Sequence, residues 1–550
     1  MLLMDSNKIK TIILASFVCF TLNSLQSQTF TKYWVKFKNK NGSPYSISNP
    51  SAFLSAKSIA RRTNQGIAVD LTDIPVNQTY INQVNATGAQ VLQRSKWMNA
   101  AVVNVSSPAQ LSAINSLTCV LSTSPVAKLY KTTPDEPIKP VANSLKTSSS
   151  VAAYNYGPSF TQVNQIGADC MHNKGYRGQN ILIAMIDAGF YEVNINPVFD
   201  SLRNEGRLMG TRDFVQGNSS VYEDNLHGAN CLSLMAGNTP GQLIGTAPKA
   251  KYWLLRSEDA ATEKIIEENY WVVAAEFADS VGADMTTTSL GYTTFDISSQ
   301  DHVYSDLDGK TSVASIAATM AARKGIFVLN AAGNEGNGSW NYIGVPADAD
   351  SICAVGSVNG SGIHSGFSSV GPTADGRIKP DLSSMGEGSY VCNPGFSFGS
   401  GNGTSYATPI LAGAVACLMQ ANPTKTNMQI LQALKSSASK STNPDNDYGW
   451  GIPNMCLADA FLNPVSVNEL EKITGFNLYP NPAQYFINFS LNQKPESVQL
   501  KDVLGKEIEV SFTEGQSNQY KIQFNNLPKG VYFISIKTTE GLINSKFIKE

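Results

Sequence analysis

The sequence is poor in charge and in histidine. Charged residues make up 15% of its 550 residues, the formal net charge is −2, and only four histidines occur. Proteins that bind nucleic acids usually concentrate basic residues on one face, so this balance argues against a nucleic-acid partner. The apolar share of 42% is enough for a large buried core, and the length allows three or four folded units.

Long apolar runs are also missing. The N-terminal run Thr11–Leu22 is too short to cross a bilayer, no later run reaches the length of a transmembrane helix, and we expect no transmembrane segment. This run follows Lys8 and Lys10 and precedes a short polar stretch, which is the order of a secretory signal peptide. We therefore predict a signal peptide over residues 1–27, with cleavage near Ser27.

The eight cysteines and four histidines show no spacing typical of a zinc site. An Asp-rich loop of the calcium-binding kind is missing as well. We therefore expect no cofactor and no metal, and structural calcium is not indicated. The spacing of the cysteines fixes no disulfide pairing, although an exported protein can form disulfides. Cys231 and Cys417 fall in predicted buried helices, and we expect them to be inert thiols.

The most informative segment is Gly401–Gly413, which reads GNGTSYATPILAG. Small residues predict a tight turn before Ser405, and the apolar run from Tyr406 to Met419 predicts a buried helix. A serine in the first turn of a helix meets backbone N–H groups and the positive end of the helix dipole, which suits an acyl-transfer nucleophile. Taken alone, the segment is equally compatible with an ordinary helix N-cap.

A serine nucleophile needs a base, and the base needs an orienting group. Of the four histidines, only His227 begins an apolar, small-residue helix, which continues through Met235. Asp187 follows the apolar run Ile181–Ile186, which predicts a buried parallel strand, and α/β sheets place their sites at the carboxyl ends of such strands. An aspartate there can also cap the next turn. We predict a catalytic triad of Asp187, His227 and Ser405.

The chain order Asp, His, Ser is that of subtilisin, and the motifs around the three residues resemble those of the subtilisin-like serine proteases. The usual IDTG corresponds to IDAG at 186–189, HGTHVAG to HGANCLSLMAG at 227–237, and GTSMATP to GTSYATP at 403–409. Further matches are GTAPKA (245–250), SLG (289–291), AAGNEG (331–336), FSSVGPTADGRIKPD (367–381) and YGWGIPN (448–454). The resemblance covers roughly residues 154–461. The departures beside the Asp and the His leave the three side chains in place and put only the subfamily in doubt.

The resemblance implies an oxyanion hole made by the backbone N–H of Ser405 and the side-chain amide of Asn334. The local sequence agrees, because Asn334 follows a strand-like apolar run, where an amide donor can meet the charge that grows on a carbonyl oxygen. The surrounding Asn-Glu-Gly-Asn-Gly is also rich in turn formers, so a purely structural role in a turn is the alternative.

Substrate binding is implied at Ser289, Leu290 and Gly291, where an extended peptide is expected to pair as an added strand. A plain strand end is the alternative, and no residue of the sequence fixes a preferred substrate side chain. Glu223 and Asp224 precede the predicted base and are interpreted as solvated loop charges, because Asp187 already fills the orienting role.

Residues 28–135 predict a separate small unit. Tyr33–Lys38 alternates as a strand, Pro50–Arg62 is typical of a helix opened by proline, and AAVVNVS and TCVLSTS predict further strands. The resemblance implies an α+β propeptide that assists folding and then inhibits its own active site, and a plain accessory domain is the alternative. Arg61 and Arg62 suggest a dibasic cleavage site, but their helical placement favours a solvated face. The Pro- and Ser-rich residues 136–153 predict a linker and processing region.

The pattern changes again after about Pro464. Residues 464–474 predict a linker, and residues 475–550 contain short alternating runs with turn signals between them, which predict a small β-sandwich. This segment resembles the C-terminal sorting domain of the type IX secretion system through LYPNPA (478–483), LKDVLGK (500–506), LPKGVYFISI (527–536) and the terminal KFIKE. The resemblance implies export across an outer membrane, followed by release or surface attachment. A carbohydrate-binding or adhesive module is the alternative.

The sequence therefore predicts an α/β protein with a subtilisin-like parallel sheet flanked by helices over 154–463, an N-terminal α+β propeptide and a C-terminal small all-β sandwich. We expect a serine endopeptidase, secreted or at the cell surface, that cleaves proteins or peptides through an acyl-enzyme. Its expected partners are its own propeptide, as intramolecular inhibitor, and the type IX secretion machinery. The competing hypothesis is a catalytically weak or inactive scaffold that acts as a surface binding protein.

Overall fold

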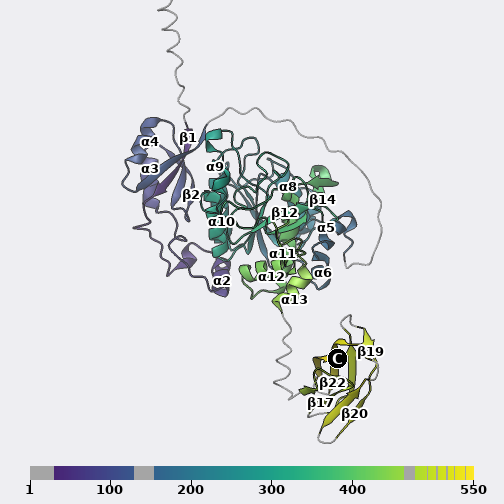
Figure 1. Ribbon diagram of the computed structural model, residues 1–550. Coiled ribbons are helices and arrows are strands. Elements are labelled where there is room, and N and C mark those ends of the chain that lie inside the picture. The colour runs from purple at the N-terminus through teal and green to yellow at the C-terminus, as the bar shows by residue number, and fades with distance from the viewer. Residues whose placement is uncertain are drawn as a thin grey trace, which may run out of the picture. The chain divides into compact units, whose positions relative to one another are not determined.

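The computed structural model describes residues 30–128, 154–463 and 477–550, the last without 492–493, 503–505, 516–517, 525–526 and 539–540. The chain forms two compact units, Met1–Leu462 and Asn463–Glu550 (Figure 1), and each is described by itself. The predicted signal peptide and both predicted linkers lie outside the described residues. Among the helices of the described part, none has the length and apolarity needed to span a membrane.

A seven-stranded sheet forms the centre of the first unit, and all its neighbouring strands run parallel, in the order β13-β12-β11-β10-β5-β9-β6. The strands are β5 (Leu182–Asp187), β6 (Leu208–Asp213), β9 (Lys251–Arg256), β10 (Met285–Thr288), β11 (Phe327–Ala331), β12 (Cys353–Val358) and β13 (Leu382–Met385). Every residue of β5 is buried, as its apolar run predicts. The α/β class is therefore confirmed.

Helices cover both faces of this sheet (Figure 1). The long ones are α8 (His227–Ala236), α9 (Ile266–Val281), α10 (Val313–Arg323), α11 (Thr404–Ala421) and α12 (Asn427–Ser437). Ile183 and Met185 of β5 pack in one core with α8 and α11, whereas Ala184 and Ile186 pack in a second core with α9 and α10. Alternate side chains of one strand thus supply the two cores, because successive residues point to opposite faces.

The N-terminal part of the first unit is a four-stranded antiparallel sheet of order β2-β3-β1-β4. Its strands are β1 (Phe30–Phe37), β2 (Gln90–Ser95), β3 (Ala100–Asn104) and β4 (Val120–Lys128), with α3 (Gln78–Ala86) and α4 (Pro108–Asn115) on one face. On the other face, Trp34, Val102 and Val126 belong to the core that contains α9 and α10. This small sheet therefore shares a hydrophobic core with one half of the large domain.

We expected the segment Pro50–Arg62 to form one helix, but it does not. It forms a 3-10 turn, η1 (Pro50–Ala52), and then α2 (Ala56–Asn64). Ser55 separates them, because its backbone is extended and its hydroxyl caps α2 by accepting from the N–H of Ser58 at 3.1 Å. A serine at this place marks the true start of the helix.

The expectation that Arg61 and Arg62 form a solvated face is wrong. Their exposed fractions are 6% and 1%. Arg61 donates to Asp279 of α9 at 2.5 Å, and Arg62 donates to the same carboxylate at 2.7 Å and to Asp73 at 2.9 Å. Buried arginines require such partners, and the partner carboxylate lies more than two hundred residues away in sequence, where no local pattern could reveal it.

One disulfide links the two ends of the large domain. Cys170 on α6 (Ala168–Asn173) is bonded to Cys456 on α13 (Met455–Leu462), a pairing that the sequence spacing left open. The other cysteines of the described residues are free and buried. The bond ties the last helix of the domain to one of its first helices.

The second unit consists of two four-stranded sheets of orders β16-β17-β21-β20 and β19-β18-β22-β23, in which all pairings are antiparallel. The strands are β16 (Asn477–Tyr479), β17 (Phe486–Ser490), β18 (Ser497–Lys501), β19 (Glu507–Ile508), β20 (Phe512–Glu514), β21 (Gln519–Gln523), β22 (Gly530–Thr538) and β23 (Gly541–Lys549). Phe489, Ile522, Ile534 and Phe547 lie in its core. The predicted all-β class is confirmed.

Candidate active site

The three predicted catalytic residues lie where elements meet at the carboxyl edge of the large sheet. Asp187 is the last residue of β5, His227 is the first residue of α8, and Ser405 is the second residue of α11. Gly228 lets α8 begin close to the end of β5, since a Cβ at this position would lie 2.9 Å from the Cβ of Asp187. Gly403 precedes α11 with a φ of 153°, which side chains disfavour.

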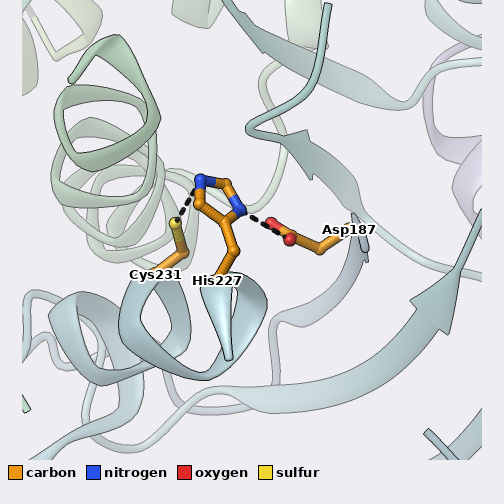
Figure 2. A group of neighbouring side chains, drawn as sticks. All are labelled: Asp187, His227 and Cys231. Atoms are coloured by element: carbon orange, nitrogen blue, oxygen red, sulfur yellow. Dashed lines mark hydrogen bonds and ion pairs between the residues drawn. The ribbon is translucent and has the colours of Figure 1, made fainter. Parts of the chain in front are cut away.

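Asp187 and His227 form a direct hydrogen bond (Figure 2). Nδ1 of His227 lies 2.7 Å from Oδ1 of Asp187, whose side chain is completely buried. The N–H of Ala188 also donates to this oxygen, at 2.8 Å. Burial lowers the pKa of His227, but the charge of Asp187 and their hydrogen bond outweigh it, so this pKa lies well above its ordinary value. The imidazole is thus oriented with Nε2 directed away from Asp187.

Cys231 lies one helical turn after His227, beside Nε2 (Figure 2). Its Sγ is 4.0 Å from Nε2 and donates to the backbone oxygen of Ser405 at 3.2 Å. Burial raises the pKa of this thiol, which keeps it protonated. Cys231 is buried, as expected, but the sequence analysis did not place it in the site. The spacing i, i+4 on a predicted helix was the signal that would have done so.

Ser405 lies against this group, but its hydroxyl is bonded elsewhere. Its Oγ donates to the backbone oxygen of Ser289 at 3.0 Å, and the hydroxyl of Ser289 donates to the backbone oxygen of Ser405 at 2.9 Å. A hydroxyl has one proton, so in this arrangement the proton is not given to His227. The structure therefore contains the Asp–His hydrogen bond of the predicted triad, whereas the hydroxyl of Ser405 is bonded to Ser289 and not to His227.

Asp187, His227 and Cys231 also form, among the described residues, the one group of His, Cys and acidic side chains with ligand atoms within 4.8 Å of one another. Nδ1 is engaged in the hydrogen bond to Oδ1, and Cys231 is a protonated thiol that donates to Ser405, whereas only a thiolate ligates metals. Nε2 and Oδ2 are then the two atoms left for an ion. Catalytic zinc sites use three protein ligands. We therefore treat the group as a hydrogen-bonded cluster and assign no metal to it.

Asn334 follows β11 and lies beside the turn before Ser405. Its Oδ1 accepts from the N–H of Thr404 at 2.9 Å and from the hydroxyl of Thr404 at 3.1 Å. The same hydroxyl accepts from the N–H of Gly333 at 3.2 Å. The oxygen of the amide is thus fixed by Thr404, and Asn334 itself is exposed. The sequence analysis missed Thr404, although its position directly before Ser405 was visible.

Of the predicted substrate-binding residues, Ser289 makes the direct contacts with Ser405 described above. The carbonyl of Leu290 accepts from the amide of Asn330 at 3.0 Å. Gly291 is exposed, and a Cβ at this position would meet no atom closer than 3.7 Å. The strand β10 ends just before this segment, in which Ser289 and Leu290 are buried and only Gly291 is exposed.

The expectation that Glu223 and Asp224 are both solvated is half wrong. Glu223 is exposed and accepts from the hydroxyl of Ser220. Asp224 lies 3.3 Å from the guanidinium of Arg256, which also pairs with the buried Asp213 at 2.9 Å. Asp224 therefore belongs to a partly buried ion-pair network beside the site and is not an isolated surface charge.

The other histidines make contacts outside the site. The ring of His172 is bonded to the hydroxyl of Tyr156 at 2.7 Å, and that of His302 pairs with Glu268 at 2.6 Å. His364 packs its ring against Tyr448. Among the four histidines, His227 alone has the carboxylate and serine neighbours that a triad needs.

Comparison with known proteins gives three family matches. Residues 32–139 match the peptidase S8 propeptide domain of Bacteroidota, residues 178–451 match the subtilase family, and residues 477–550 match the secretion system C-terminal sorting domain. These matches confirm the resemblances that the motifs predicted.

Comparison with individual proteins supports the subtilase match. Subtilisin NAT from Bacillus subtilis subsp. natto is 32% identical over 326 residues, which cover 57% of this chain and 77% of that protein. Subtilisin E from Bacillus subtilis (strain 168) gives the same values. Subtilisin from Bacillus pumilus is 31% identical over 300 residues, which cover 54% of this chain and 97% of that protein.

The matches support a serine peptidase with a propeptide, and the sorting domain points to secretion through the type IX system. The arrangement of the parallel sheet, with Asp187, His227 and Ser405 gathered at its carboxyl edge, agrees with them. The chain belongs to the subtilase family.

Proposed function

We propose that this protein is a secreted serine endopeptidase that hydrolyses peptide bonds in proteins through an acyl-enzyme on Ser405. The observation that carries the proposal is the 2.7 Å bond between Asp187 and His227 next to Ser405. The hydroxyl of Ser405 turns from Ser289 to Nε2 and attacks the substrate carbonyl, while His227 accepts its proton. Asp187 stabilises the imidazolium, His227 then protonates the leaving amine, and water hydrolyses the acyl-enzyme.

The oxyanion formed in this reaction is proposed to bind the backbone N–H of Ser405 and the NH₂ group of Asn334. The amide can serve as a donor because Thr404 holds its oxygen, which leaves the NH₂ group to donate. A donor fixed before the reaction stabilises the developing charge without reorganisation. The substrate backbone is proposed to pair along the segment of Ser289, Leu290 and Gly291, as the sequence predicts.

The propeptide is proposed to be an intramolecular inhibitor. Its sheet shares a buried core with α9 and α10, so it is docked as part of one compact unit. Export is proposed to use the signal peptide of residues 1–27 and the C-terminal sorting domain, which leaves the mature enzyme secreted or at the cell surface.

The proposed function is tested on the full chain, by labelling with a fluorophosphonate and by measuring the hydrolysis of casein. The wild type is expected to label, to release its propeptide and to cleave casein, and Ser405→Ala is expected to do none of these. Ser400→Ala serves as the matched control, since Ser400 is an exposed serine on the preceding strand β15 (Ser397–Asn402). A folded wild type that neither labels nor cleaves would favour the alternative, a subtilase scaffold that acts as a surface binding protein.

A further inference from the structure

The propeptide contacts the large domain at a second place, away from its own sheet. The helix α2 lies apart from the four-stranded sheet of the propeptide (Figure 1), and its side chains contact the turns that precede β10 and β11. Both turns belong to the amino edge of the large sheet, whereas Ser405 and the other predicted catalytic residues lie at its carboxyl edge. The strands themselves therefore separate this contact from the candidate active site.

Arg61 of α2 is bound there by three acceptors of the large domain. Its Nη2 donates to Oδ1 of Asp279 at 2.5 Å and its Nη1 to the backbone oxygen of Ala283 at 2.5 Å. Its Nε donates to the backbone oxygen of Lys324 at 3.2 Å. Each of the three nitrogens of the guanidinium thus has an acceptor from the large domain. A planar group with donors in a fixed fork fits this arrangement, which the compact ammonium of a lysine does not.

The carboxyl ends of two helices form part of this site. Gly282 ends α9 with a φ of 84°, and Gly325 follows α10 with a φ of 86°, the left-handed conformation common at helix ends. The backbone oxygens of Ala283 and Lys324 therefore lie at the negative ends of two helix dipoles, which favour a cation. A Cβ at Gly282 would lie 2.7 Å from the backbone nitrogen of Ser58, so α2 directly contacts the end of α9.

The large domain does not pair the carboxylate of this site itself. Asp279 lies in the last turn of α9, which contains no basic residue, and its side chain is completely buried. Within the described ranges, its ion-pair partners are Arg61, Arg62 and Lys96, all of which belong to the propeptide. The propeptide therefore supplies the positive charge that a buried carboxylate requires.

Two neighbours of Arg61 on α2 extend the contact. Nζ of Lys57 pairs with Asp284 at 2.5 Å, and the amide of Gln65 donates to the backbone oxygen of Gly325 at 2.8 Å. Lys57, Arg61 and Gln65 are spaced by four residues, so they lie on one face of the helix. This face of α2 is thus held at three successive points along the amino edge of the large sheet.

We propose that the amino edge of the large sheet carries a guanidinium-binding site that holds the cleaved propeptide through Arg61, independently of the active site. The site consists of Asp279 and the backbone oxygens of Ala283 and Lys324. The inference goes beyond the proposed peptidase function and rests on it only in that processing cuts the propeptide from the rest of the chain. The cleaved propeptide then has two linked anchors, its sheet and α2, which together retain it longer than either one alone.

The test uses the full chain with Ser405→Ala and with the recognition sequence of a sequence-specific protease inserted into the linker of residues 136–153. After the cut, only noncovalent contacts hold the propeptide, and the half-time of its loss from the immobilised protein is measured. We expect Arg61→Gln to shorten this half-time at least about tenfold, because the buried Asp279 loses a charged hydrogen-bond partner. An unchanged half-time overturns the proposal.

Arg94→Gln is the matched control. Arg94 is exposed on β2 and donates to Gln78 of the propeptide itself, at 2.8 Å. Its variant is expected to keep the half-time of the parent chain, and an equal shortening by both variants overturns the proposal. Urea unfolding of the uncut chains shows whether each variant is folded. If Arg61→Gln does not fold, a second measurement on the chain that keeps Arg61 decides.

The second measurement adds small ligands to this cut chain. N-acetyl-L-argininamide is expected to shorten the half-time about threefold or more as its concentration rises, because it competes for the site whenever α2 detaches. N-acetyl-L-citrullinamide, which has nearly the same shape but no charge, is expected to have no effect at equal ionic strength. Equal effects of the two ligands, or no effect of either, overturn the proposal.

Both measurements are independent of catalysis, because the chain lacks the hydroxyl of Ser405. Their results are therefore the same whether or not the proposed peptidase function is correct. Fluorophosphonate labelling of the wild type tests that function separately.

Discussion

The variant Asp187→Asn replaces one buried oxygen with an amide nitrogen and leaves the shape of the side chain nearly unchanged. In the structure, Oδ1 accepts from both His227 and Ala188, at 2.7 and 2.8 Å, whereas Oδ2 is buried and has no partner among the described residues. The side-chain amide of the variant can therefore adopt two orientations, which differ in whether its oxygen or its nitrogen takes the position of Oδ1. If its oxygen stays at the position of Oδ1, the NH₂ group is buried without an acceptor, which costs about 1–3 kcal/mol.

In the other placement, the NH₂ group faces the N–H of Ala188, and Nδ1 of His227 must become an acceptor. The imidazole proton then sits on Nε2, where the base is needed. Either placement removes the charge that stabilises the imidazolium. We expect kcat to fall by about 10⁴-fold, the loss in kcat that the same substitution causes in a Ser-His-Asp protease.

The pH dependence of kcat/KM gives a second test of the role of Asp187. The carboxylate of Asp187 raises the pKa of His227 well above its ordinary value, and only neutral His227 acts as a base. Wild-type kcat/KM therefore rises with pH through this raised pKa. Without the carboxylate the pKa falls, so the acidic limb of the residual activity moves to lower pH.

The assay uses a fluorogenic peptide over a pH series, with the variant matured in trans by tagged wild-type enzyme that is then removed. Asp224→Asn is the control, because Asp224 pairs with Arg256 next to the site and is expected to cost less than tenfold. A loss below a hundredfold for Asp187→Asn, or an acidic limb that stays in place, would refute the role assigned to Asp187.

Three further outcomes are expected. Asn334→Ala lowers kcat by about 10²–10³-fold with folding intact, as for the corresponding asparagine of subtilisin, and steady-state kinetics with a loss under tenfold would contradict the oxyanion role. Asp279→Asn in an inactive chain that keeps its propeptide lowers the free energy of unfolding by about 3–5 kcal/mol, because it leaves the buried Arg61 without its carboxylate partner. Urea unfolding measures this loss, against at most about 1 kcal/mol for the exposed Asp447→Asn. Cys456→Ser lowers the free energy of unfolding by about 2–5 kcal/mol. A reductant should destabilise the wild type but not this variant, and equal sensitivity would mean that the bond to Cys170 does not form.

Local sequence was sufficient for the elements that carry the site. The apolar run before Asp187, the small-residue helix that begins at His227 and the turn before Ser405 each define their own structure. The parallel order of the strands follows once helices alternate with buried strands, because crossovers of that kind place all carboxyl ends at one edge. The roles assigned to these residues remain predictions that the experiments above test.

Contacts between segments that are distant in the sequence could not be predicted from local sequence patterns. Nothing near Arg61 and Arg62 indicates that Asp279 neutralises them, and a helical arginine is solvated unless a partner buries it. The hydrogen bond from Ser405 to Ser289 depends on a side-chain torsion, which no motif records.

The helix α9 explains why the propeptide and the peptidase behave as one unit. Asp279 accepts from Arg61, Arg62 and Lys96 of the propeptide, and Glu276, one turn earlier, accepts from the backbone N–H of Lys96 at 2.7 Å. Both carboxylates are buried, and their partners come from the propeptide. Cleavage of the linker alone changes none of these contacts. Under the proposed inhibitory role, we expect the propeptide to stay bound after processing, and full activity to require that it be degraded or displaced, with Asp279 and Glu276 returning to water.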